Sequence, residues 1–220
     1  MRQVREAGYL PMYRLYGTTH TSTCAVKAAL TEAGAPFEEV EIATRKNQHL
    51  SEEYRQINPR QQVPSLMLPD GSIMTEGPAI LLHIADAHPE VRLAPTPGTS
   101  ERAQHDRWLI FLALNVNEGG QRWNYPERFT TDTNGKQAVE EAARAYMDRH
   151  FSIFEEALGN GPYFFGDDLS MLDIYVWMLA HWPGGGAAWL EANCPKIVRL
   201  ANTVKVRPKI APIEEENFGT

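Results

Sequence analysis

The stretch from residue 64 to 87, PSLMLPDGSIMTEGPAILLHIADA, predicts two short strands that lead directly into a helix. Pro69 presets φ at the start of the connecting turn, and Gly71 can adopt the positive φ that such a turn requires. Pro78 suits the first turn of the following helix, whose apolar residues recur at helical spacing. A hairpin followed at once by a helix places this part of the chain in an α/β unit.

The residues before the hairpin predict two strands and two helices in alternation. A helix is expected from Thr21, because apolar residues then recur at helical spacing, and Gly34 suits the position just after its end. The order βαβαββα predicts an α/β domain with a mixed four-stranded sheet over residues 12–88. Its earlier elements are predicted as a strand at 12–17, the helix from 21, a strand at 36–42 and a short helix within 47–59.

The rest of the chain predicts a linker and then an all-α C-terminal helical-bundle domain. Residues 89–99 are rich in proline and form the expected linker, and the helical domain covers 100–220. Ser170 and Asp173 form a capping-box pattern ahead of a helix that is apolar nearly all round and is therefore expected to be buried. The expected helices are 100–118, ended by Gly119-Gly120, then 136–158 and 171–182.

Composition and cysteine usage exclude several functional classes. The net charge of -7 and pI near 5.5 argue against a general nucleic-acid binder. Cys24 and Cys194 are the only cysteines and lie far apart, which favours a reducing compartment and indicates neither a disulfide framework nor a zinc cluster. The apolar runs are too short to span a bilayer, and the first residues lack the apolar core of a secretory signal. We therefore expect a cytoplasmic protein.

Common catalytic and metal-binding motifs are missing as well. The chain has no P-loop, GxGxxG, GxSxG or HExxH pattern. His83 and His88 are five residues apart and do not share a helix face, so no metal site is expected.

Two turns could bind a ligand through backbone groups. Val63 precedes Pro64 at the start of a strand, where its N–H and C=O could pair with an extended peptide; a simple pre-strand proline is the alternative. At the next turn, the Gly77 N–H at a helix N-terminus could bind a carboxylate while Glu76 pairs with an ammonium group. Ordinary capping by Thr75 or Glu76 is the alternative there.

These motifs together resemble the cytosolic glutathione transferase family. The resemblance rests on QVPSL (62–66), followed by TEGPAI (75–80), and on SMLDI (170–174), and it extends from Met12 to about Pro208. It implies a thioredoxin-like N-terminal domain that binds glutathione and a helical domain that supplies the pocket of the second substrate. The bacterial Ser- or Cys-type classes, beta, theta and zeta, are the most similar.

The resemblance assigns the glutathione-binding residues one by one. Pro64 is expected to follow a cis peptide bond, and Val63 to pair with the cysteinyl backbone of glutathione. Glu76 is expected to bind the γ-glutamyl ammonium. The family usually has Ser where this chain has Gly77, so a hydroxyl contact is lost, and either weaker affinity or a compensating donor such as Gln62 is expected.

For the glycyl carboxylate, the pattern KNQHLS (46–51) nominates His49, with Lys46 as the alternate; His49 could equally be a solvated surface histidine.

The turn TTHTSTC (18–24) is expected to stabilise the thiolate of bound glutathione. A helix N-terminus and a hydroxyl donor both favour negative sulfur. Ser22 and Thr21 are the joint catalytic candidates, and Thr19 and His20 are less favoured. One of the two must also cap the helix. Cys24 is expected to be a small buried hydrophobe, and Tyr16 to pack in the core.

The second substrate is expected to bind between the first helices of the helical domain. The candidate lining residues are Phe111, Asn115, Trp123 and Tyr125, whereas Trp108 is more typical of core. The resemblance implies a homodimer that uses glutathione and a small hydrophobic electrophile, with no metal. A binding or regulatory protein that has lost catalysis, and a glutathione-dependent isomerase, dehalogenase or peroxidase, remain as alternatives.

Overall fold

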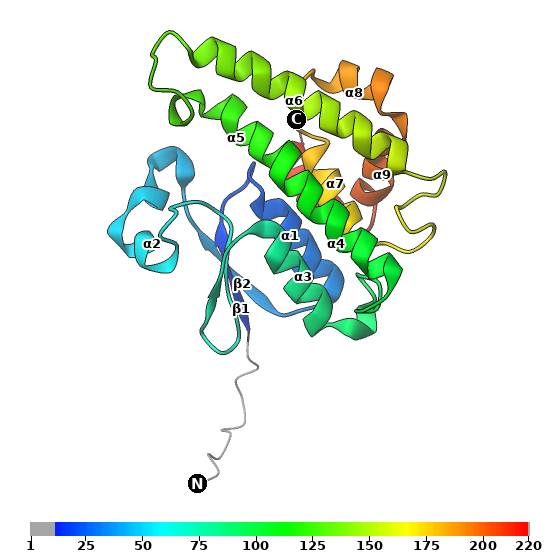
Figure 1. Cartoon of the computed structure of the whole chain (residues 1–220). Coiled ribbons are helices and arrows are strands. Elements are labelled where there is room, and N and C mark those ends of the chain that lie inside the picture. The colour runs from blue at the N-terminus through cyan, green and yellow to red at the C-terminus, as the bar shows by residue number, and fades with distance from the viewer. Residues whose placement is uncertain (1–11, 220) are drawn as a thin grey trace.

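The computed structural model describes residues 12–219, and its first part is a mixed four-stranded sheet, as the sequence predicts (Figure 1). The strand order is β2-β1-β3-β4. β1 is parallel to β2 and antiparallel to β3, which is antiparallel to β4. The strands are β1 (Tyr13–Gly17), β2 (Phe37–Glu41), β3 (Ser65–Met67) and β4 (Ile73–Met74).

Helices cover both faces of this sheet. Along β1, Leu15 points into the main core beneath α1 (Thr23–Ala33) and α3 (Gly77–Ala87). Tyr16 points to the other face, where it packs with Tyr54 of α2 (Glu52–Ile57) in a smaller cluster. This alternation is the period of two that a strand buried on both faces requires. Single turns of 3₁₀ helix link the elements: η1 (Thr44–Lys46), η2 (Gln48–Leu50) and, after α3, η3 (Pro89–Val91).

The second part is helical and packs on α1 and α3 (Figure 1). None of the helices within residues 12–219 is long and apolar enough to cross a membrane. The elements are α4 (Ser100–Leu112), the π-helical segment η4 (Ala113–Asn117), α5 (Glu118–Asn124), η5 (Pro126–Arg128), α6 (Lys136–Ala157), α7 (Met171–Leu179), α8 (Ala187–Asn193), α9 (Pro195–Lys205) and α10 (Ala211–Phe218).

The prediction that Gly119-Gly120 ends the first long helix is wrong. The helical path continues through both glycines and ends at Asn124. A Cβ on Gly119 would lie 2.5 Å from Cγ of Met147, so this glycine allows α5 and α6 to pack closely. Its role is close packing between helices, which sequence alone does not distinguish from a helix stop.

α7 is the buried central helix that the sequence predicts, although it ends at Leu179, before residue 182. Every residue of α7 is buried. Asp173 accepts hydrogen bonds from the Ser170 N–H at 2.8 Å and from the Phe164 N–H at 2.8 Å. Burial raises the pKa of Asp173 to about 6, and these donors oppose the increase. The carboxylate thereby joins the helix start to the preceding loop.

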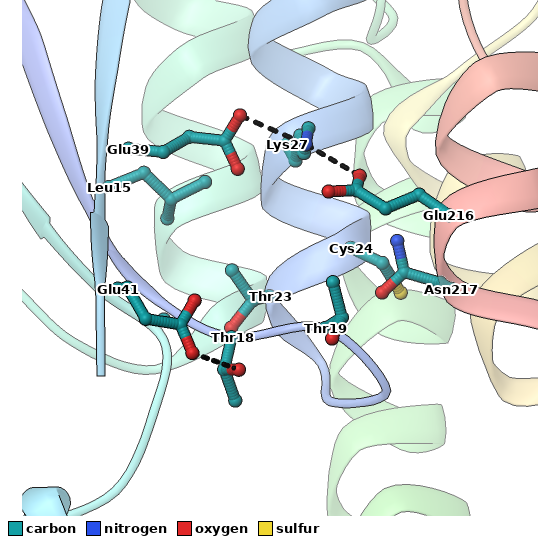
Figure 2. A pocket seen from close by; sticks show the side chains of 11 residues that line it. Leu15, Thr18, Thr19, Thr23, Cys24, Lys27, Glu39, Glu41, Glu216 and Asn217 are labelled. Atoms are coloured by element: carbon teal, nitrogen blue, oxygen red, sulfur yellow. Dashed lines mark hydrogen bonds and ion pairs between the residues drawn. The ribbon is translucent and has the colours of Figure 1, made fainter. Parts of the chain in front are cut away.

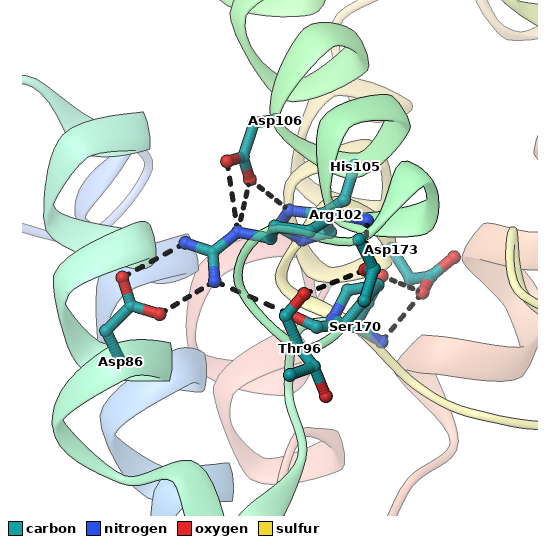
Figure 3. A network of polar contacts seen from close by, with 9 residues as sticks. Asp86, Thr96, Arg102, His105, Asp106, Ser170 and Asp173 are labelled. Carbon is teal, nitrogen blue, oxygen red and sulfur yellow. Dashed lines mark hydrogen bonds and ion pairs between the residues drawn. The ribbon is translucent and has the colours of Figure 1, made fainter.

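Arg102 of α4 joins the two parts of the chain (Figure 3). Its guanidinium donates to both carboxylate oxygens of Asp86 on α3, at 2.7 and 3.0 Å, and to Asp106 at 2.8 Å. The Arg102 side chain is 10% exposed, so these bonds are poorly accessible to water from the arginine side. Arg102 holds the pKa of Asp86 below its usual range.

Arg102→Met should lower the free energy of unfolding by about 2 kcal/mol, since Asp86 and Asp106 lose charge-assisted bonds. A carboxylate with a depressed pKa contributes stability above its unfolded pKa and loses it as pH falls. The difference between the variant and the wild type should therefore shrink below about pH 4. Urea unfolding at several pH values measures both effects, with the exposed Arg149→Met as control. An equal loss in both variants would contradict the role of Arg102.

Candidate functional site

The turn between β1 and α1 contains four hydroxyl side chains, and Thr21 uses its own to close the turn. Its Oγ1 lies 2.7 Å from the Thr18 carbonyl oxygen and 2.8 Å from Thr23 Oγ1. The Thr23 N–H donates to Thr21 Oγ1 at 3.3 Å. Thr21 therefore satisfies an N–H at the start of α1, which is the role of a capping side chain.

Ser22 occupies the N-cap position of α1, yet its side chain does not cap the helix. Its backbone is helical, with φ -60° and ψ -4°, and no side-chain capping bond is formed. Ser22 is half-buried, beside the N–H groups at the positive end of the helix dipole. Of the two joint candidates, Thr21 is the one engaged in capping, and Ser22 has the hydroxyl that a ligand could use.

The other residues of this region are in less suitable places for thiol chemistry. Cys24 is 1% exposed, and burial raises the pKa of its thiol far above the ordinary value, so it is not a ready thiolate. Tyr16 packs in the cluster under α2. The Thr18 hydroxyl donates to Glu41 at 2.7 Å. His20 is exposed and has φ 58°.

The Val63–Pro64 peptide bond is cis, as the family resemblance implies. Val63 lies ahead of Ser65, the first residue of β3, so its backbone groups are outside the β1–β3 ladder. The neighbouring Gln62 carbonyl accepts from the Tyr54 hydroxyl and from Asn58 Nδ2, both at 2.7 Å. These two bonds fix the loop that presents Val63.

Glu76 and Gly77 lie at the N-terminus of α3, and Glu76 has a partner that the sequence did not predict. Arg60 Nη1 lies 2.8 Å from Glu76 Oε1, and both side chains are more than half exposed. An exposed pair of this kind is weak and rearranges easily. Arg60 is therefore a cation at the place where the sequence indicates recognition of an ammonium and a carboxylate.

Nothing around Gly77 requires a glycine. Its φ is not positive, and a Cβ at this position would have no heavy atom within 4 Å. The usual Ser of the family would therefore fit here without moving a neighbour.

His49 lies in η2, where it is half-buried and near the positive charge of Arg128 from the helical part. Burial and the nearby Arg128 lower its pKa, so the imidazole is mainly neutral at pH 7. Its Nδ1 is buried without a hydrogen-bond partner among the described residues. The alternate, Lys46, is exposed. Arg128 is thus a further cation near the predicted glycyl carboxylate site, and sequence patterns did not indicate it.

The four candidate pocket residues do not line one surface. Phe111 and Asn115 face α6, where Asn115 accepts from the Tyr146 hydroxyl at 2.5 Å and Phe111 lies 5.5 Å from the His150 ring. Trp123 also packs on α6, under the Arg144 guanidinium. Tyr125 is separate, 40% exposed and covered by Arg128. Trp108 is buried in the core, as expected.

Comparison with known proteins decides the family. Residues 11–86 match the model of the glutathione S-transferase N-terminal domain, and residues 124–216 match that of the C-terminal domain. The chain belongs to the glutathione S-transferase family. The uncharacterized GST-like protein YncG of Escherichia coli K12 is 30% identical over 94% of this chain and 98% of its own length. GstA of E. coli O157:H7 is 26% identical over 77% of this chain and 81% of its own.

Solved structures of glutathione transferases have the same fold. A homologue from Sulfitobacter with bound glutathione superposes with a TM-score of 0.86 and 27% identity, over 94% of this chain and 98% of that one. A sphingomonad glutathione S-transferase in complex with glutathione has a TM-score of 0.75 and 26% identity, over 91% and 96%. Within residues 12–219, no group of three or more His, Cys, Asp or Glu side chains could hold a metal ion.

The two turn hydroxyls should differ in their effect on stability. Thr21→Ala should lower the free energy of unfolding by about 1 kcal/mol, because the Thr23 N–H loses its cap. Ser22→Ala should change it by less than about 0.5 kcal/mol, since no capping bond is lost. Thermal and urea unfolding of the two variants measure this difference. A greater loss in Ser22→Ala would mean that Ser22 is the true cap.

Proposed function

We propose that the protein is a glutathione transferase that holds the thiol of glutathione as a thiolate for attack on an apolar electrophile. The observation that carries the proposal is that, in the β1–α1 turn, the Thr21 hydroxyl caps the helix and the Ser22 hydroxyl does not. Relatives of similar sequence with glutathione bound in their structures support the same ligand for this chain.

The proposed step needs a donor for negative sulfur and an acceptor for a proton. The thiol proton leaves to water, and the Ser22 hydroxyl donates to the sulfur as negative charge forms. Such a bond contributes about 1.5 to 3 kcal/mol, and the N-terminus of α1 adds up to about 2 kcal/mol. At about 1.4 kcal/mol per pKa unit, the two together could lower the thiol pKa by two or three units. Sulfur then bonds to the electrophilic carbon, and the leaving group departs with the electron pair.

Glutathione is proposed to lie between the two predicted backbone sites. Val63 would pair with its cysteinyl backbone, Glu76 would bind the γ-glutamyl ammonium, and Gly77 N–H would bind the γ-glutamyl carboxylate. Arg60 is positioned beside Glu76 and could replace the missing hydroxyl by donating to that carboxylate, alongside the earlier candidate Gln62.

At the other end of glutathione, His49 would bind the glycyl carboxylate, with Arg128 adding positive charge.

The second substrate and the assembly are also proposals. A small hydrophobic electrophile would bind on the side of Tyr125, which is exposed, more readily than among Phe111, Asn115 and Trp123, which pack against α6. A cytoplasmic homodimer agrees with the family. Ile110 and Leu114, 44% and 64% exposed along one side of α4 and η4, suit a dimer contact.

Ser22→Ala tests the proposed chemistry. The pKa of the thiol of bound glutathione should rise by about one to two units, and kcat/KM with an aryl halide at neutral pH should fall about 10- to 100-fold. Thiolate absorbance against pH and steady-state rates give the two values, with Thr19→Ala as control. Unchanged kinetics in Ser22→Ala would remove Ser22 from the mechanism.

The wild-type protein separates the alternatives. Retention on immobilised glutathione without turnover of any electrophile would favour a binding or regulatory protein. A maleylacetoacetate isomerase of Pseudomonas aeruginosa and a maleylpyruvate isomerase of a Ralstonia species are 20% and 24% identical to this chain, so cis–trans isomerisation of a conjugated diacid belongs among the assays. No retention and no turnover would refute the proposal.

Gly77→Ser should tighten glutathione binding about fivefold, because the added hydroxyl can donate to the γ-glutamyl carboxylate for about 1 kcal/mol. The matched control is Gly77→Ala, which changes the backbone in the same way without a hydroxyl and has the same free space. Calorimetric titration with glutathione compares them. Equal affinities in the two variants would show that the carboxylate does not lie at residue 77.

A further inference from the structure

The C-terminal helix, α10, makes a direct contact with the turn that carries Ser22. The His20 N–H donates to Asn217 Oδ1 at 3.0 Å, across 197 positions of sequence. Asn217 is 3% exposed, and its Nδ2 donates to the Ile213 carbonyl at 2.9 Å. The two bonds use both ends of the amide and so fix its orientation.

His20 is in a conformation that needs external support. Its φ is 58°, in the left-handed region, which is uncommon for residues other than glycine. Such a residue keeps this conformation only where the surrounding structure holds it. Because His20 is exposed, its side chain is not packed in place, and the bond from its backbone to Asn217 is the contact that joins it to α10.

The side of the turn that faces α10 is open at Thr18 and Thr19. A cavity of about 120 Å³ lies there, and Figure 2 shows that its lining includes Thr18 and Thr19 of the turn and Glu216 and Asn217 of α10. Thr18 and Thr19 therefore have no packing partner across this space, and the bond from His20 to Asn217 is a direct link between the turn and α10.

α10 itself is firmly held, so it can serve as a fixed support. Glu216 lies 2.6 Å from Lys27 of α1, which also lies 2.9 Å from Glu39 of β2. Glu214 accepts from the Trp177 indole N–H at 2.7 Å, and its Oε2 lies 3.0 Å from His181 Nε2. The ring of Phe218 stacks on that of His181 at a centroid distance of 3.5 Å.

We propose that Asn217 is a positioning residue for the thiolate site. It holds residues 18–22 in the conformation in which Thr21 caps α1 and Ser22 is left for the ligand. The inference rests on the proposed function for its catalytic part, and on the geometry alone for its structural part. Asn217 itself is not placed in contact with glutathione.

Asn217→Leu removes the acceptor while nearly keeping the volume. Amide hydrogen exchange of residues 18–22 in the ligand-free protein should accelerate about tenfold, because the turn loses its contact with α10. The pKa of the thiol of bound glutathione should rise by about one unit, and kcat/KM at neutral pH should fall about tenfold. Faster exchange without a change in the thiol pKa, or no change in exchange, would overturn the proposal.

Two further variants control the result. Asn217→Asp keeps an acceptor for the His20 N–H and should restore slow exchange; exchange is the readout here because the added charge has its own effect on the thiol. Glu216→Gln weakens one ion pair of α10 but leaves the contacts of Glu214 and Phe218, so exchange of the turn should stay slow; exchange is the readout here too, because the lost charge has its own effect on the thiol. Fast exchange in Asn217→Asp, or an effect in Glu216→Gln equal to that of Asn217→Leu, would overturn the proposal.

Misfolding and failure of the proposed function are both recognisable. If Asn217→Leu does not fold, Asn217→Ser replaces it, because a serine hydroxyl can still bond the Ile213 carbonyl but is too short to hold the turn. A wild-type protein that does not bind glutathione contradicts the proposed function before any variant is made. The exchange comparison then still decides whether Asn217 holds the turn.

Discussion

The burial of α1 on nearly all of its sides fixes how the elements around it are arranged. This helix contacts β1, α3, α7 and α10, and nine of its eleven residues are buried. Alanines at 25, 28, 29 and 33 permit this close approach from several directions. Because its sides are enclosed, only its N-terminus is available for chemistry. The N–H groups at the start of the helix, and the turn that leads into them, are therefore held in one place by the core.

Within that turn, most polar groups are already bonded to the protein itself. Thr21 closes the turn, Thr18 is engaged with Glu41, and Asn217 holds the backbone of His20. Ser22 and Thr19 are left without a side-chain hydrogen bond among the described residues, and of the two only Ser22 occupies the N-cap position of α1. A hydroxyl that already donates a hydrogen bond within the protein is a poor donor to a ligand, since breaking that bond would cost about as much as the new bond contributes. This reasoning disfavours Thr18 and Thr21, and the position of Ser22 at the start of α1 favours it over Thr19.

Much of the fold could be predicted from local patterns. The order of the first seven elements, the capping residues Ser170 and Asp173, and the buried helix that follows them all agree with the structure. These features depend on residues a few positions apart, where periodicity and capping chemistry are informative. The helix stop at Gly119-Gly120 was wrong because a glycine that permits close packing against Met147 looks the same in sequence as one that ends a helix.

Residue types and short spacings were enough to predict the element order, the family resemblance and a short list of candidate residues. The turn hydroxyl that serves as the cap became clear from the folded chain alone, through the bond from the Thr23 N–H to Thr21. Folding also brought Arg60 to Glu76 across 16 positions and Asn217 to His20 across 197. No periodicity links residues so far apart, since their contact follows from how the core packs α1, α3 and α10 together.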